Sequence, residues 1–95
     1  MGYYLPIPVA KGKAELAIEM YDAREVPQSE ASKSIDDPTL AVIVVINNGP
    51  FEAAGFAFDR DEFIVFSLPQ DHRPKRWFVM DRVKACEATG YRGKE

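Results

Sequence analysis

The chain has 95 residues, enough to form one domain with a small core. Its residues are 46% hydrophobic and 12% aromatic, a composition too apolar for a disordered protein. Its net charge of -3 is too small to indicate a nucleic-acid or membrane partner by itself. The single cysteine excludes an internal disulfide, and no apolar run approaches the ~18 residues of a membrane span. The N-terminal residues lack the pattern of a secretory signal. We therefore expect one globular α+β domain over residues 1–95, located in the cytoplasm.

The first two segments are predicted to be strands. Pro6 and Pro8 remove N–H donors from one side of an extended segment, which indicates an edge strand containing Leu5, Ile7 and Val9. Residues 14–24 combine helix-favouring composition with a strand-like alternation of apolar and acidic residues. Burial usually decides over propensity, so we expect a strand there, preceded by a hairpin tip at Gly12, with a helix as the alternative.

Residues 27–38, PQSEASKSIDDP, form the least hydrophobic stretch of the chain. Two prolines and three serines in twelve residues are typical of a surface loop. A short helix inside this loop, capped by Ser29, is the alternative interpretation.

Residues 40–68 are predicted to form an antiparallel meander. Residues 40–47, LAVIVVIN, are largely β-branched on both faces, which indicates a central strand covered on both sides. The turn NNGP follows, and residues 54–58 and 62–68 are then expected to form two strands joined by the acidic turn DRDE. With the two earlier segments, this predicts a mostly antiparallel sheet of about five strands.

The last element is predicted to be a helix over residues 80–89, packed on the sheet. Trp77 and Phe78 lead into it as a short extended segment. The apolar residues Val79, Val83 and Cys86 recur at helical spacing. Asp81 is a suitable N-cap, and Gly90 stands where a helix would end in the left-handed conformation.

The basic segment before this helix is the first candidate site. Residues 71–84 contain five basic and two acidic side chains, a local balance of +3, together with the only tryptophan. Arg73, Lys75 and Arg76 would contact phosphates, and Trp77 would stack on a base. In the alternative interpretation Trp77 anchors the core and the basic residues remain solvated. Because the whole domain is acidic, an acidic protein surface is a better partner for this segment than nucleic acid.

The acidic segment from residue 12 to residue 37 is the second candidate site. It contains seven acidic and three basic side chains, a balance of -4. The residues proposed to contact a partner are Glu15, Glu19, Glu25, Asp36 and Asp37. A solvated surface explains them, and the functional interpretation is a negative surface that meets a basic partner.

Catalytic and metal-binding patterns are not supported by the residues present. Zinc needs three or four Cys or His ligands, and the chain has one of each. His72 and Cys86 are the residues from which a nucleophile–base pair would be built, but Cys86 falls on the predicted apolar stripe. The carboxylates of DRDE are expected to point into water, and no phosphate-loop motif occurs. We expect no catalytic residue, no metal and no cofactor.

In overall profile the chain is similar to the small, acidic, single-domain α+β proteins that phages encode to block bacterial defences, anti-CRISPR proteins among them. The similarity lies in size, charge and predicted fold, and it assigns a role to no residue. It implies a non-enzymatic inhibitor or adaptor that binds a protein or nucleoprotein complex. The first alternative is a weak nucleic-acid-binding protein that uses residues 73–76, and the second is a small enzyme with an atypical site. No membrane partner is expected, and a homodimer remains open.

Overall fold

A computed structural model describes residues 7–9, 16, 18–48, 51–69 and 72–92. The α+β class is confirmed: five strands form one antiparallel sheet in the order β1-β4-β3-β5-β2. In chain order the elements are β1 (Ile7–Val9), β2 (Arg24–Val26), α2 (Gln28–Ser34), β3 (Leu40–Asn48), β4 (Phe51–Ala57), α3 (Arg60–Phe66), β5 (Lys75–Asp81) and α4 (Arg82–Thr89). Several helices replace the single predicted one.

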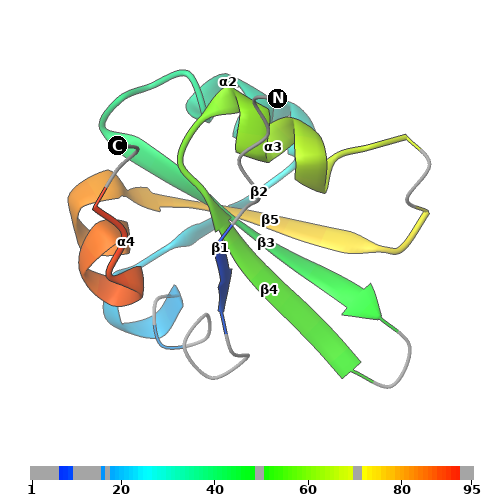
Figure 1. Ribbon diagram of the computed structural model, residues 1–95, viewed down its shortest axis with the longest axis horizontal. Helices are drawn as coiled ribbons and strands as arrows, with labels where there is room; N and C mark the ends of the chain where they lie inside the picture. Colours follow the sequence, from blue (N-terminus) through cyan, green and yellow to red (C-terminus); the bar gives the residue numbers. More distant parts are fainter. Residues whose placement is uncertain (1–6, 10–15, 17, 49–50, 70–71, 93–95) are drawn as a thin grey trace.

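Helices cover both faces of the sheet (Figure 1). On one face α2 and α3 enclose a core that includes Val42, Val44, Trp77 and Val79. On the other face, residues 18–21 and α4 cover a second core built around Ile43, Phe56, Phe58, Phe78 and Met80. The central strand β3 supplies residues to both cores, so the expectation of a doubly covered strand at 40–47 is confirmed.

The two edges of the sheet are formed by its two shortest strands. β1 pairs only with β4, in the register Pro8 opposite Gly55, which confirms the predicted edge strand. Leu5 and the predicted hairpin tip at Gly12 lie outside the described residues. β2 forms the other edge and pairs with the middle of β5. Short edge strands leave few backbone groups available for pairing with another chain.

The predicted strand over residues 14–24 is wrong for the residues that the structure describes. Residues 16 and 18–20 are helical, and only Arg24 enters a strand. The helical turn ends at Asp22, which adopts φ 59°, and the Ala23 N–H donates to the Ile18 carbonyl over 3.2 Å. This is the bonding of a Schellman helix end, with aspartate where glycine is usual. The end signal was therefore missing from the sequence.

The predicted surface loop at 27–38 is mostly the helix α2, so the alternative interpretation holds. Pro27 stands at the N-cap position, and its side chain makes no capping hydrogen bond, so the expected cap at Ser29 is wrong. Ala31, Ser34 and Ile35 are buried against the sheet. Three small or apolar residues at helical spacing were enough to bury one side of a polar segment.

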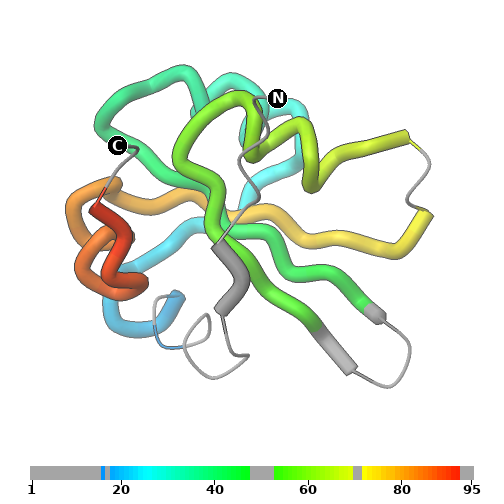
Figure 2. The backbone as a smooth tube through the Cα atoms, viewed as in Figure 1, coloured from blue at the N-terminus to red at the C-terminus, as the bar shows by residue number. Residues whose placement is uncertain are grey.

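The third strand of the predicted meander is also a helix, α3. The Asp59 side chain accepts a hydrogen bond from the Glu62 N–H at 3.0 Å, which makes Asp59 an N-cap. Glu62 is 2% exposed, and its carboxylate accepts from the Phe58 N–H at 2.8 Å. DRDE is therefore a capped helix start that resembles a capping box, except that Glu62 bonds to the residue before the N-cap. Figure 2 follows the chain from β4 into α3.

The C-terminal elements are close to the prediction. Trp77 and Phe78 belong to a full strand, β5, and α4 begins at Arg82 with Asp81 as the N-cap. Gly90 ends the helix with φ 77°, as predicted. The predicted apolar stripe is wrong, because Val83 is 68% exposed while Ala85 is buried. Val79 lies in β5, so helical spacing does not relate it to Val83.

Candidate partner-binding site

One residue of the predicted acidic site pairs with one residue of the predicted basic site. Glu25 on β2 accepts two hydrogen bonds from the Arg76 guanidinium on β5, at 2.9 and 3.1 Å. The same guanidinium lies 5.2 Å from the ring centre of Phe78. The hydrogen bonds from Arg76 lower the pKa of Glu25, so the ion pair is kept until the pH falls below this reduced value. Both residues are committed to an internal contact.

Asp36 and Asp37 are used locally as well. Asp36, which follows α2, forms an ion pair at 2.5 Å with Arg60 of α3, so it joins two helices on one face of the sheet. Asp37 accepts hydrogen bonds from the Thr39 hydroxyl at 2.7 Å and the Thr39 N–H at 2.9 Å. These two hydrogen bonds lower the pKa of Asp37. Asp36 therefore links the end of α2 to α3, and Asp37 stabilises the connection between α2 and β3.

The remaining predicted contacts are dispersed. Glu19 is exposed on the helical turn, and Glu15 lies outside the described residues. Arg73 is exposed and Lys75 half-buried at the start of β5. Trp77 is 4% exposed, with its ring 5.0 Å from that of Phe63. Its assignment as a partner contact is corrected, because a side chain in the core cannot stack on a ligand.

His72 and Cys86 lie at opposite ends of β5. His72 precedes this strand and Cys86 is in the helix that follows it. Seven residues of strand span about 23 Å, far beyond the reach of a hydrogen bond. No cluster of three potential metal ligands occurs within the described ranges.

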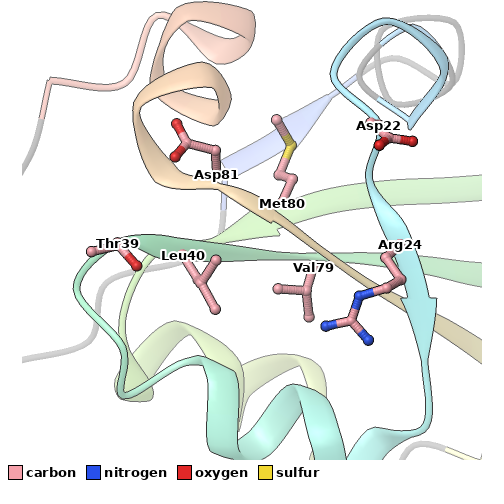
Figure 3. Close-up of a pocket in the computed structure, with 7 residues that line it drawn as sticks. All are labelled: Asp22, Arg24, Thr39, Leu40, Val79, Met80 and Asp81. Carbon is pink, nitrogen blue, oxygen red and sulfur yellow. The ribbon is translucent and has the colours of Figure 1, made fainter.

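A pocket of about 430 Å³ lies at the end of the sheet where β5 passes into α4 (Figure 3). The pocket is lined by Asp22, Arg24, Thr39, Leu40, Val79, Met80 and Asp81. Leu40, Val79 and Met80 make it partly apolar, and the other four residues supply charges and a hydroxyl. The pocket exists because β2 begins only opposite Val79, so the end of β5 extends past its neighbour.

The charged residues of the pocket come from different elements. Arg24, on β2, pairs in register with Val79 and therefore points to the face covered by α2 and α3. Asp22 terminates the helical turn, and Asp81 caps α4. Within the part of the chain that the structure describes, Arg24 and Asp22 have no side-chain hydrogen bond or ion pair. These side chains are therefore free to meet a ligand.

Two exposed apolar side chains lie on the helical turn that precedes the pocket residue Asp22. Leu16 is 52% and Met20 66% exposed, and residues four apart lie on the same side of a helix. Ile18 and Tyr21 of this turn pack against the core instead. We call Leu16, Met20 and the seven pocket residues the arm–pocket surface.

Sequence reasoning missed this surface except for the general acidity of its surroundings. The predicted strand over 14–24 would place Leu16, Ile18 and Met20 on one face. In the helical turn Ile18 packs against the core, while Leu16 and Met20 are exposed. The pocket depends on where β2 begins relative to β5. The sequence contains no pattern from which the register of these two strands could be predicted. Asp81 was predicted only as a helix cap, and Asp22 only as one of the seven acidic residues of the 12–37 segment.

Comparison with known protein families, curated proteins and solved structures found no match. No helix in the described ranges has both the length and the apolar composition needed to cross a bilayer.

Proposed function

We propose that this chain is a non-enzymatic protein-binding module, an inhibitor or adaptor that acts on a protein or nucleoprotein complex through the arm–pocket surface. The observation that supports the proposal most directly is the exposure of Leu16 and Met20 on the helical turn that leads to the pocket residue Asp22. Exposing two large apolar side chains on one side of a helical turn is unfavourable in water. Contiguous exposed apolar surface is typical of protein-interaction sites, and these two side chains would form part of such a surface.

The mixed character of this surface also favours a protein partner. A protein interface typically has an apolar centre surrounded by polar groups. Here the exposed Met20 and the half-buried Leu40 supply apolar area, while Asp22, Arg24 and Asp81 supply charge. The inhibitor or adaptor role, with a cytoplasmic location, extends the proposal on the basis of the overall similarity to small phage-encoded inhibitors.

A capture experiment with matched charge insertions tests the proposal. The purified chain would be immobilised and exposed to a lysate of the cell that expresses it, and retained proteins would be identified by mass spectrometry. Met20→Glu places a charge on the arm–pocket surface. Ile64→Glu places the same charge at an exposed apolar residue of α3, on the opposite face of the sheet, where Ile64 is 48% exposed.

We expect one defined protein to be retained by the wild-type chain and by Ile64→Glu, and lost with Met20→Glu. A buried apolar contact of this size is worth roughly 1.5–3 kcal/mol, so the loss should be at least tenfold. Equal retention by all three chains would place the partner elsewhere, and selective loss with Ile64→Glu would move the site to α3.

A further inference from the structure

The two methionines that the structure describes differ sharply in exposure. Met20 is 66% exposed on the helical turn that ends at Asp22, whereas Met80 is 3% exposed in the core under α4. Peroxides oxidise the thioether of methionine to the sulfoxide, and the peroxide must reach the sulfur atom to do so. The fold therefore offers the sulfur of Met20 to a dissolved oxidant and protects that of Met80.

The position of Met20 makes its oxidation consequential. Ile18 and Tyr21 of the same turn pack against the core, while Leu16 and Met20 are exposed and lie four residues apart on one side of the helical turn. Oxidation converts a flexible apolar side chain into a polar one, which disrupts contacts that methionine makes at interfaces. The core contacts of Ile18 and Tyr21 are not involved, so the fold of the turn should survive the change.

We propose that Met20 is a reversible redox switch of the arm–pocket surface, with hydrogen peroxide or an organic hydroperoxide as the oxidant. The O–O bond of the peroxide breaks, one oxygen atom bonds to the Met20 sulfur, and the other leaves as water or an alcohol. The sulfur supplies the two electrons that reduce the peroxide. A methionine sulfoxide reductase reverses the step with two thiols, which become a disulfide as the oxygen leaves in water. The selective oxidation follows from exposure alone, and its effect on binding rests on the proposed function.

Peptide mapping tests the selectivity without a partner. The folded chain would be treated with hydrogen peroxide and digested with trypsin, which leaves the three methionines on separate peptides, residues 1–11, 14–24 and 77–82. Fragmentation locates the added oxygen. Met20 should be oxidised at least about tenfold faster than Met80, because a core residue reacts only when the protein opens. The two rates should become similar in concentrated urea. Similar rates in the folded chain would overturn the inference.

Met20→Leu is the matched control for the effect on binding, because leucine keeps an apolar side chain and cannot form a sulfoxide. This variant retains Cys86 and the other two methionines, so oxidation elsewhere affects both chains alike. In the capture experiment, peroxide treatment should lower retention of the partner by the wild-type chain about three- to tenfold. It should leave retention by Met20→Leu unchanged. Treatment of the oxidised wild type with the reductase and dithiothreitol should restore binding.

The outcomes separate this inference from the proposed function. Unchanged partner retention by a wild-type chain whose Met20 is fully converted to the sulfoxide would overturn the switch, even if Met20→Glu loses the partner. An equal loss of binding by oxidised Met20→Leu would also overturn it, because another residue would then be responsible. Retention of the partner by untreated Met20→Glu would instead defeat the proposed function, and with it the effect on binding, while the mapping result for Met20 would stand.

Discussion

Trp77 directly follows Arg76 in the chain, yet the two side chains have opposite environments. Trp77 is buried against Phe63, while Arg76 lies exposed in its ion pair with Glu25. Alternation along a strand produces this difference, because successive side chains point to opposite faces. The charge of neighbouring residues is therefore a poor guide to the role of a tryptophan in a strand.

The buried position of Trp77 predicts a stability effect. Trp77→Ala should lower the free energy of unfolding by about 3–5 kcal/mol, because it removes a large core side chain and leaves a cavity. Trp77→Phe should lower the free energy of unfolding by clearly less. This variant should remain folded even if Trp77→Ala does not fold. Urea unfolding should be followed by circular dichroism, since Trp77 is the only tryptophan fluorophore. Val83→Ala, at a residue 68% exposed, is the control and should stay within about 0.5 kcal/mol of wild type. A wild-type stability for Trp77→Ala would contradict the core assignment.

At the scale of elements, α3 depends on its first residues. Its sequence FIVF is apolar and partly β-branched, and this composition alone favours a strand. Asp59 and Glu62 offset that preference by satisfying N–H groups at the helix start.

Removal of the cap should therefore destabilise the protein. Asp59→Ala should lower the free energy of unfolding by about 1 kcal/mol, while Asp59→Asn, which keeps a capping oxygen, should lower it less. Thermal unfolding of the three proteins, monitored by circular dichroism, would measure the difference. Identical stability of Asp59→Ala and wild type would show that the contact from Asp59 to the Glu62 N–H does not hold the helix start.

The elements that could be predicted from sequence are those whose signals agree. β3 combines β-branched residues with apolar character on both faces, and α4 has a cap at Asp81 and a glycine at Gly90, so both were found within a few residues. The segments at 14–24 and 62–68 carry conflicting signals. In the segment 14–24, the helix ends at Asp22 without a glycine. Before the segment 62–68, the capping residues of DRDE are also typical of a hairpin turn. Of the candidate site, only single charged residues could be anticipated, because the pocket arises from the offset between β2 and β5.

At the scale of the whole molecule, folding brings the oppositely charged segments into contact through one ion pair. The negative segment and the positive segment lie on adjacent strands, where Glu25 and Arg76 pair, and Asp36 pairs with Arg60. In the described part of this segment, Arg76 is therefore engaged by Glu25 and Lys75 is half-buried, while Arg73 remains exposed. This arrangement bears directly on the nucleic-acid alternative.

We expect the chain to bind random single-stranded DNA more weakly than a Kd of ~10⁻⁴ M at ~50 mM salt, the weak limit of ordinary non-specific binding. The net charge of -3 opposes association, Arg76 is held by Glu25, and buried Trp77 cannot stack on a base. Fluorescence anisotropy with a labelled oligonucleotide would measure the affinity. Glu25→Gln releases Arg76 from its carboxylate partner, and it should still not produce tight binding because Trp77 stays in the core. Micromolar affinity that falls steeply with salt and disappears in Arg73→Glu would instead establish the basic segment as a nucleic-acid site, and the arm–pocket surface would then lose its place as the main contact.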